Sequence, residues 1–573
     1  MKVIFLRTYL LLFLISLPFA GQAFGEVRER IRQHVGQLAS GVPLQFGEDT
    51  IASVIVLPAL YEKYDYQRIW RDQDTSRQLL SAIDSIYLQG LNPGDYHDKE
   101  IRSLLEEQET ALDEGRQAEL DLLLTDSLIR IGYHLQIGKV DPEALDSNWN
   151  MNRMLPGLDP VLELSEAIDT GNVTQLIDSF RPQAPVYRNL MTALAQYRGI
   201  EAQGGWPTVP DGETLKPGMK DARITILRNR LQVTGDMPAE NMESDLFDST
   251  VEEGVKHYQQ RHGLDDDGIL GKGTLAALNV SVADRINQIR VNLERARWIL
   301  HDLPEEFVVA DIAGFYVKYY RGGDIVWEGR SQVGKPYRKT PVFRDQIRYL
   351  EFNPTWTVPP TILKKDVMPA IKRDPDYLAK KNMRVLTGKG KPVDAAAIDW
   401  SQYPEKSFPY LIRQEPGPGN ALGRIKFMFP NKHLVYLHDT PSKGLFEQSA
   451  RAFSSGCIRV ENPFGFAERL LENTPGWDRS RIMREVDTAK TSRVNLAEPV
   501  TVMLLYWTVA VDAAGTVIFK DDIYQRDAAV LDGLNEPFRF RDAPILDEQA
   551  GRQPDTALNI AAGLTGSQAI RFH

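Results

Sequence analysis

The N-terminal part of the chain carries a helical pattern of apolar positions. From about Val27 to Gln203, stretches such as SRQLLSAIDSIYLQGL and ELDLLLTDSLIRIGYHLQIG place apolar residues three and four positions apart, the spacing of one face of an amphipathic helix. Turn signals such as Asn92-Pro93-Gly94 separate these stretches. Nothing here has catalytic spacing. We therefore predict a helical scaffold domain over residues 27–203.

A second, smaller helical unit follows a linker, GGWPTVPDGETLKPGMK. Residues 221–280 fit three short amphipathic helices. Asp248, Ser249 and Thr250 are candidate caps before one of them, and Gly263 is placed to end it. The pattern predicts a compact three-helix unit.

Apolar and polar residues alternate from Phe307 onward, which is typical of β-strands. FVVADIAGFYVKYYRGGDIVWEGRSQVG alternates around Gly322-Gly323 and predicts a β-hairpin. KFMFP, HLVYLHD and VTVMLLYWTVAVDAAGTVIFKDD are further expected strands. We predict a mainly-β domain over residues 305–527, interrupted by a helical insertion at 361–415.

Length and composition fit several folded domains. A chain of 573 residues exceeds one hydrophobic core, at roughly 150 residues per domain. With the units above, the expected fold class is multidomain α+β. Residues 528–573 are polar and irregular, so we expect a poorly ordered C-terminal tail.

The first residues have the layout of a secretory signal. Lys2 and Arg7 precede an apolar run over 9–20, which is followed by small residues around Ala23. We predict that residues 1–25 are a signal peptide or, if uncleaved, an N-terminal membrane anchor. The protein is therefore expected to be exported.

Charge and cysteine usage narrow the function classes. A formal net charge of −11 argues against nucleic-acid binding, which needs a basic surface. The single cysteine, Cys457, cannot form an intrachain disulfide, and an exported lone thiol favours a chemical role. A buried structural cysteine is the alternative. No cluster has metal-ligand spacing and no loop has a nucleotide-binding pattern, so we expect no metal and no cofactor.

Cys457 and one histidine supply the parts of a thiolate catalyst. His438 ends the strand HLVYLH, and Cys457 stands in FSSGCIRV, where Ser454, Ser455 and Gly456 are small. A thiol nucleophile needs an imidazole or a lowered pKa, together with backbone N–H groups that bind the oxyanion. We predict that Cys457 is the nucleophile, that His438 is its base, oriented by a backbone carbonyl, and that the amides of Gly456 and Cys457 are oxyanion donors.

The segment 435–460 resembles the catalytic motif of the L,D-transpeptidase (YkuD) domain, in which a His precedes a Ser-x-Gly-Cys-x-Arg block. Cys457 stands 19 positions after His438, and Arg459 matches the arginine of the block. The chain departs from many members at Ser455, where they carry a second histidine. The resemblance implies that peptidoglycan stem peptides are cross-linked through a cysteine thioester, and that carbapenems acylate the thiol.

Longer stretches resemble the long periplasmic L,D-transpeptidases of the YcbB type. They are NPTWTVPP, PGPGNALGRIKFMFPN and SKGLF before RAFSSGCIRV. Residues 258–279 also resemble a peptidoglycan-binding domain. The order of scaffold, peptidoglycan-binding and catalytic domains matches this subgroup from about residue 27 to 527.

This closer resemblance implies further site residues and partners. It implies a lid over the active site at 361–415 and substrate-binding roles for Trp356, Tyr436 and Phe446. Nine Lys or Arg against three Asp between Thr361 and Lys391 fit a lid that attracts carboxylates, although a solvated surface explains them equally well. The implied partners are stem peptides, glycan strands and other wall-synthesis proteins in the periplasm, where the protein would contribute to cell-wall biogenesis and cell shape.

Two alternative functions remain open. With water as the acceptor, the same residues would make the protein an L,D-carboxypeptidase or a hydrolase that cleaves cross-links or anchors. The protein could also be a non-catalytic wall-binding scaffold, and the three-helix unit could be a spacer that binds nothing. Intact His438 and Cys457 count against the scaffold, but acceptor choice depends on groove shape and water exclusion.

Overall fold

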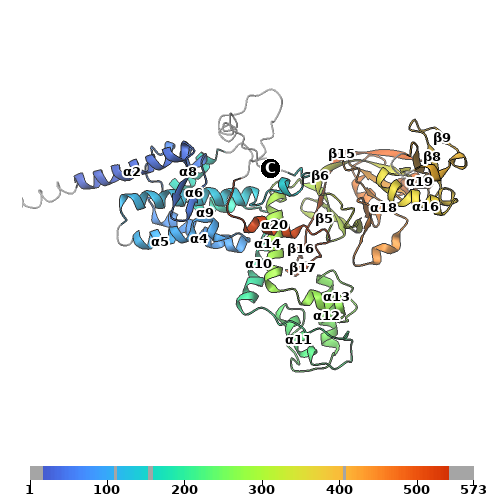
Figure 1. Ribbon diagram of the computed structural model, residues 1–573, viewed down its shortest axis with the longest axis horizontal. Helices are drawn as coiled ribbons and strands as arrows, with labels where there is room; N and C mark the ends of the chain where they lie inside the picture. Colours follow the sequence, from blue (N-terminus) through green and yellow to red (C-terminus); the bar gives the residue numbers. More distant parts are fainter. Residues whose placement is uncertain (1–16, 109–111, 152–158, 404–407, 541–573) are drawn as a thin grey trace, which may run out of the picture.

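The computed structural model describes residues 17–108, 112–151, 159–403 and 408–540. A helical unit and a sheet domain lie at opposite ends of its long axis, with a small three-helix unit to one side (Figure 1). Within the described ranges no helix is both long and apolar enough to cross a membrane. Most of the predicted signal segment, residues 1–16, lies outside these ranges, and the first described helix begins at Leu17.

The N-terminal helical unit packs around one buried helix, α6 (Glu114–Ile137), whose N-terminus is capped by Asp113. The other helices of the unit are α2 (Leu17–Ala39), α3 (Val56–Lys63), α4 (Gln73–Ile86), α5 (Asp98–Gln108), α7 (Pro142–Leu145), α8 (Pro160–Asp169), α9 (Val173–Ser179) and α10 (Pro185–Ala202), with 3-10 turns η1 (Tyr87–Gln89) and η2 (Pro93–Tyr96). A hairpin of β1 (Leu44–Phe46) and β2 (Asp49–Ile51) was not predicted, because three residues are too few to show alternation.

The predicted three-helix unit is present. It consists of α11 (Arg223–Val233), α12 (Ser249–Arg261) and α13 (Lys272–Leu278), packed around their own apolar core. Asp248 caps α12 by accepting a hydrogen bond from the Val251 N–H. Gly263 follows the helix with φ +65°, as expected of a residue that ends it.

A long helix, α14 (Val282–Ile299), connects the three units (Figure 1). It packs against α6 and α10 of the helical unit and against the C-terminal helix α20 (Asp527–Asn535). Asn292 of α14 donates a hydrogen bond to Thr508 Oγ1 (2.7 Å), and Arg295 forms an ion pair with Asp527 (2.7 Å). These contacts tie α14 to the C-terminal part of the sheet domain.

The sheet domain contains a nine-stranded sheet in the order β13-β5-β14-β12-β11-β6-β15-β3-β4, and β5 also pairs with β4, so the sheet closes on itself. Its strands are β3 (Glu306–Asp311), β4 (Tyr316–Arg321), β5 (Asp324–Gly334), β6 (Phe343–Phe352), β11 (Ile425–Met428), β12 (Leu437–His438), β13 (Ala452–Ser454), β14 (Ile458–Val460) and β15 (Ser492–Leu505). Helices α18 (Pro463–Leu470) and α19 (Arg479–Asp487) and turn η6 (Lys443–Glu447) complete it.

The predicted hairpin is confirmed in this domain, and a second hairpin forms where further strands were expected. β4 and β5 pair from Tyr316–Arg330 to Arg321–Asp324, with Gly322 and Gly323 at φ +58° and +90° in the turn. The second hairpin pairs β16 (Val509–Val511) with β17 (Val517–Phe519). Both follow from local alternation around a turn signal.

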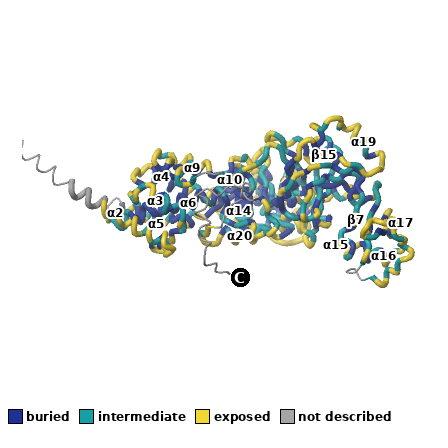
Figure 2. Tube along the Cα trace, turned by 90° about the horizontal axis from the view of Figure 1, so that it is seen from above, coloured by how far each residue is buried: buried dark blue, intermediate teal, exposed yellow. Residues whose placement is uncertain are grey.

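The insertion, residues 361–415, is a mixed unit rather than a helical one, and it projects from the end of the sheet domain (Figure 2). Its elements are α15 (Pro360–Ile362), the π-helical η3 (Leu363–Val367), α16 (Met368–Arg373), α17 (Tyr377–Lys380), β8 (Met383–Leu386), β9 (Pro392–Val393), η4 (Ala395–Ala397), η5 (Trp400–Gln402) and β10 (Leu411–Gln414). With β7 (Trp356–Thr357), its strands form a sheet in the order β7-β10-β8-β9. The unit has its own apolar core, and its strands are too short to have been predicted from alternation.

The prediction of a poorly ordered tail from residue 528 is wrong for its first part. Residues 527–535 form α20, in which Val530 and Leu534, one helical turn apart, are buried in the core of the helical unit. This burial compensates for the low apolar content of the surrounding sequence. Residues 541–573 lie outside the described ranges.

Candidate active site

Cys457 lies in a tight turn between β13 and β14. Ser454 Oγ donates a hydrogen bond to the Cys457 carbonyl (2.5 Å) and accepts one from the Gly456 N–H (3.0 Å). Gly456 has φ +119°, a conformation that L side chains rarely adopt. Thr340 Oγ1 donates to the Gly456 carbonyl (2.9 Å). Hydrogen bonds from within the turn and from the neighbouring loop therefore fix the backbone beside the thiol.

The same bonds correct the prediction for the oxyanion donors. The Gly456 N–H is already bound to Ser454 Oγ, so in this arrangement it is not available to a substrate. Within the part of the chain that the structure describes, the Cys457 N–H has no hydrogen-bond acceptor. This leaves the Cys457 amide as the donor that the turn offers.

A row of polar side chains crosses the sheet next to Cys457. We call it the polar row, and in order across β6, β11, β12, β14 and β5 it consists of Glu351, Lys426, His438, Arg459 and Gln332, each directly opposite the next. Residues opposite one another on neighbouring strands share a face of the sheet. Tyr436 and Cys457, two positions before His438 and Arg459, lie on that face by alternation.

His438 is buried and uncharged. Its Nδ1–H donates to the backbone carbonyl of Asp439 (2.5 Å), so the predicted backbone partner is confirmed and the lone pair is on Nε2. The Leu422 backbone also forms a hydrogen bond with the ring. Burial, together with the positive charges of Arg459 and Lys426, lowers the pKa of His438 to about 3. The Asp439 carboxylate does not contact the ring; it accepts the Arg424 N–H (2.8 Å).

The surroundings of the half-buried Cys457 thiol have opposing effects on its pKa. Burial raises its pKa, whereas a hydrogen bond from the Tyr436 backbone and the charges of Lys426 and Arg459 lower it. Arg459 is held by Gln332, donating to Oε1 at 3.0 Å. Lys426 lies over the Tyr436 ring, with Nζ 3.6 Å from the ring centroid. The environment thus favours a thiolate electrostatically while burial opposes it.

Ser455, where many L,D-transpeptidases carry a histidine, has a cationic partner. Arg338, in the loop between β5 and β6, donates from Nη1 to Ser455 Oγ (2.6 Å) and to Asp366 Oδ2 (2.7 Å). Asp366 belongs to η3 of the insertion. Arg338 therefore links the insertion to the turn that carries Cys457.

Two predicted substrate-binding residues lie apart from the polar row. Trp356 is in β7, opposite Gln414, and packs against the core of the insertion. Phe446 is 1% exposed in η6. A buried ring supports the turn and does not line an open groove, so the structure does not place Phe446 as a contact residue. Tyr436 is the one of the three that lies beside Cys457.

Sequence reasoning missed four residues of this site: Glu351, Lys426, Gln332 and Arg338. A charged residue within the apolar strand IKFMF was a usable signal. Alternation along the strand places Lys426 on the other face of the sheet from Ile425 and Phe427. The signal could not show which residues of other strands stand beside it, since those come from β6, β12 and β14.

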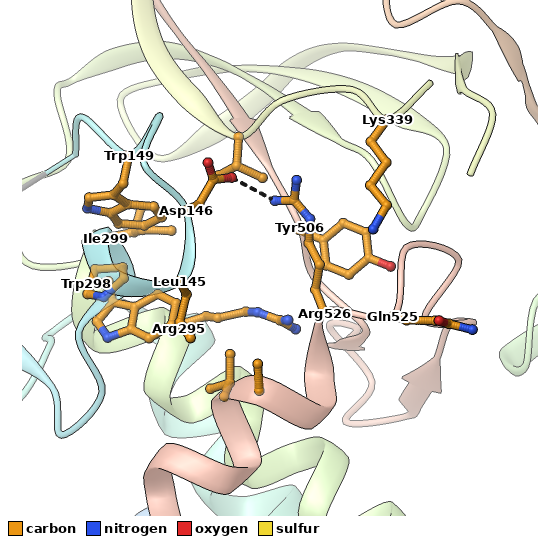
Figure 3. Close-up of a pocket in the computed structure, with 14 residues that line it drawn as sticks. Leu145, Asp146, Trp149, Arg295, Trp298, Ile299, Lys339, Tyr506, Gln525 and Arg526 are labelled. Atoms are coloured by element: carbon orange, nitrogen blue, oxygen red, sulfur yellow. Dashed lines mark ion pairs between the residues drawn. The ribbon is translucent and has the colours of Figure 1, made fainter. Parts of the chain in front are cut away.

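A cavity of about 380 Å³ lies away from this site, between the helical unit, α14 and the sheet domain (Figure 3). Trp149 and Trp298 pack edge to face on one side (5.5 Å between centroids), and Arg526 pairs with Asp146 (3.3 Å) on another. Neither Cys457 nor His438 lines the cavity, so it is separate from the candidate active site. Among the described residues, no group of three or more His, Cys, Asp or Glu could hold a metal ion.

Comparison with known families assigns each of the three units. Residues 305–482 match the L,D-transpeptidase catalytic domain (YkuD), residues 56–194 match a "Scaffold domain", and residues 220–278 match a "Putative peptidoglycan binding domain". The match to the catalytic domain includes Cys457, His438 and the rest of the polar row.

Individual similar proteins were also found. A Haemophilus influenzae protein described as "Putative L,D-transpeptidase" is 26% identical over 491 residues, 85% of this chain and 81% of the relative. A solved L,D-transpeptidase from Xylanimonas cellulosilytica is 13% identical, covering 52% of this chain and 99% of that chain, with a TM-score of 0.18. One from Mycobacterium smegmatis is 13% identical, covering 35% and 58%, with a TM-score of 0.17.

The chain therefore carries an L,D-transpeptidase catalytic domain of the YkuD family together with a peptidoglycan-binding domain. The multidomain α+β architecture predicted from the sequence is confirmed, with a helical scaffold, a small helical domain and a mainly-β catalytic domain.

Proposed function

We propose that this protein forms cross-links between peptidoglycan stem peptides, with Cys457 as the nucleophile. The observation that carries the proposal is the position of the thiol: a hydrogen-bonded turn holds it, and it lies on the same face of the sheet as the polar row. A thiol near cations, on a sheet face that also carries an imidazole, is suited to acyl transfer.

In the proposed reaction, Cys457 sulfur attacks the carbonyl of the diamino-acid residue in a tetrapeptide stem. The amide bond to the terminal D-residue breaks, and that residue leaves as an amine after it takes up a proton. The amine on the side chain of a neighbouring stem then attacks the thioester, forms the cross-link and releases the thiolate. The Cys457 N–H is our candidate donor to the tetrahedral oxyanion.

His438 is the proposed proton carrier. Because its Nδ1–H is bound to the Asp439 carbonyl, the neutral ring presents Nε2, which can accept the thiol proton and pass it to the leaving amine. Arg459 and Ser454 are proposed to hold the catalytic residues in place. Arg459 lies opposite His438 on the neighbouring strand, and Ser454 closes the turn that carries Cys457.

The other domains fit an exported wall enzyme. We propose that residues 221–280 bind glycan strands or stem peptides, that residues 27–203 are the scaffold, and that residues 305–527 carry out the reaction in the periplasm. We also propose that the insertion acts as a lid over the stem peptide. Its link to the Cys457 turn through Arg338 supports this role.

Incubation of the purified protein with a disaccharide tetrapeptide tests the proposal. Mass spectrometry should find cross-linked dimer and a released D-residue. Tripeptide monomer without dimer would instead indicate an L,D-carboxypeptidase that uses the same residues. Recovery of unchanged substrate would indicate a non-catalytic wall-binding protein.

A further inference from the structure

Lys426 occupies an unusual position for a lysine. It stands in β11 between two buried neighbours, Ile425 and Phe427. On the opposite face its side chain lies over the ring of Tyr436, with Nζ 3.6 Å from the ring centroid. Its cross-strand partners are Glu351 on one side and His438 on the other. The ammonium group therefore lies within the polar row.

Tyr436 brings this cation to the thiol. Leu437 pairs with Ile458 on the parallel strands β12 and β14, and Tyr436 and Cys457 directly precede these two residues in the chain. The charge of Cys457 acts on the Tyr436 hydroxyl, so the two side chains lie near each other. The Ile458 N–H donates to the Tyr436 carbonyl (2.9 Å). A cation held on the face of the Tyr436 ring thus lies next to the position of the sulfur.

We propose that Lys426 is a positioning residue for the thiolate of Cys457, which it stabilises as a fixed positive charge held on Tyr436. The inference rests on the proposed function, because it takes Cys457 as the nucleophile, and it extends that function by naming a source of positive charge other than His438. An opposite charge a few ångströms away favours the ionised form of a group.

The other members of the polar row explain why this charge is needed. His438 is held neutral, so it contributes no positive charge before it accepts a proton. The Arg459 guanidinium donates to the neutral amide of Gln332 and keeps its charge, so it acts on the thiol together with Lys426. Among the residues that the structure describes, no acceptor lies within hydrogen-bond distance of Lys426 Nζ, so its charge is not neutralised by a direct contact.

Glu351 carries the negative charge of the polar row, and it affects both Lys426 and the thiolate. Burial lowers the pKa of Lys426, and Glu351, which lies directly across from it, acts in the opposite direction and favours the charged form of that lysine. Its own negative charge acts against a thiolate on the same face. Arg493, opposite Glu351 on β15, lies over the Tyr349 ring (3.5 Å) rather than over Tyr436. The charges that face Cys457 are therefore Lys426, Arg459 and, further along the row, Glu351.

The single cysteine makes the test specific. Alkylation by iodoacetamide, a neutral reagent, reports the thiolate fraction of Cys457 and of no other residue. Its rate should be measured from pH 6 to 10 in the full-length protein. We expect Lys426→Met to slow alkylation at pH 7 by about tenfold, the effect of one pKa unit on the thiolate fraction. Lys426→Arg should restore most of the rate, and Glu351→Gln should increase it.

Lys432→Met is the matched control, since it removes an exposed lysine from the connection that follows β11 and should leave the pH profile unchanged. Equal profiles for wild type and Lys426→Met, with both proteins folded by circular dichroism, would overturn the inference. If Lys426→Met unfolds, Lys426→Gln takes its place, and a profile equal to that of wild type in a folded Lys426→Gln would overturn the inference. Alkylation does not depend on cross-linking, so a failure of the proposed function would appear separately as missing dimer.

Discussion

Arg338 and Asp366 form a 2.7 Å ion pair between the sheet domain and the insertion. The same nitrogen of Arg338 donates to Ser455, two residues before Cys457. The insertion is otherwise built around its own core, so its position relative to the thiol depends on contacts of this kind. The ion pair is the clearest physical route by which lid position and the geometry of the Cys457 turn are coupled.

The first prediction tests this link. Asp366→Asn keeps the shape of the side chain but removes its charge, so the insertion should lose an anchor. We expect severalfold faster hydrogen exchange in residues 361–373, measured by mass spectrometry. Because Asp366 is half exposed, the global free energy of unfolding should change by less than about 1 kcal/mol.

Asp376→Asn is the control for that experiment. Asp376 is an exposed carboxylate of the same insertion, and its ion-pair contact to Lys380 is 4.0 Å long. Equal exchange in the two variants would show that Arg338 does not hold the insertion.

A second prediction concerns the nucleophile itself. Cys457→Ala and Cys457→Ser should each abolish dimer formation while the melting temperature stays close to that of wild type, because a serine hydroxyl beside the same imidazole is a much weaker nucleophile than a thiolate. A carbapenem should add one drug mass to wild type and none to either variant in intact-mass spectra. A drug adduct on Cys457→Ala would show that a residue other than Cys457 is the reactive group.

Gly456 gives a third prediction, based on backbone conformation. At φ +119° a Cβ finds space, with its nearest neighbour, the Lys339 carbonyl oxygen, 3.8 Å away, but the conformation itself is strained for an L residue. Gly456→Ala should therefore destabilise the domain by about 1–2 kcal/mol and slow β-lactam acylation by displacing the thiol. Gly444→Ala, where φ is not positive and nothing lies within 4 Å, should do neither.

The fourth prediction is a pH profile. His438, with a pKa of about 3, stays neutral from pH 5 to 9, whereas the thiolate fraction of Cys457 increases with pH because burial raises the thiol pKa. Acylation by a carbapenem should therefore rise with pH across this range, without the step near pH 6.5 that a free imidazole would produce. His438→Ala should lower the rate at every pH, and a variant that matches wild type from pH 6 to 9 would exclude the base role.

Protein stability should also depend on pH through the protonation of His438. Its folded pKa lies below the unfolded value near 6.5, so the contribution of the neutral ring to stability is present above pH 6.5. It is lost as the pH falls toward 3, because the unfolded chain binds the proton more readily. Urea unfolding at several pH values should show this slope in wild type and a smaller one in His438→Gln.

Local patterns in the sequence were sufficient for much of the fold and for the two central residues of the site. The hairpin around Gly322-Gly323 and the cap and stop signals of α12 are encoded within a few positions of each other. Cys457 and His438 could be proposed as catalytic residues because one thiol and a strand-ending histidine are visible without a structure.

What could not be predicted depends on contacts between distant segments. Lys426 and Glu351 become neighbours through strand register, which no local pattern specifies. Arg338 reaches Ser455 from a loop more than a hundred positions earlier in the chain. The C-terminal helix α20 is stabilised by burying Val530 and Leu534 in a core made by the N-terminal unit, so its own sequence gives little indication of it.

The last prediction concerns the whole insertion as a lid. Its two ends already lie side by side: Thr357 pairs with Arg413 across β7 and β10, and the Val358 N–H donates to the Ile412 carbonyl (2.9 Å). A short Gly-Ser linker in place of residues 361–409 can therefore close the gap as a hairpin and leave the nine-stranded sheet intact. The variant should fold, as judged by circular dichroism and a single thermal transition.

Removal of a lid should change the fate of the thioester rather than its formation. Water competes with the amine of the acceptor stem for the acyl-enzyme, and a closed lid excludes water until the acceptor arrives. We expect the ratio of tripeptide to cross-linked dimer to rise severalfold in the linker variant, while a small β-lactam still acylates Cys457 at close to the wild-type rate. Loss of acylation would mean that the insertion supports the Cys457 turn through Arg338, and Arg338→Ala should then reproduce that loss. An unchanged ratio with normal acylation would contradict the lid role and would assign water exclusion to the polar face around Tyr436.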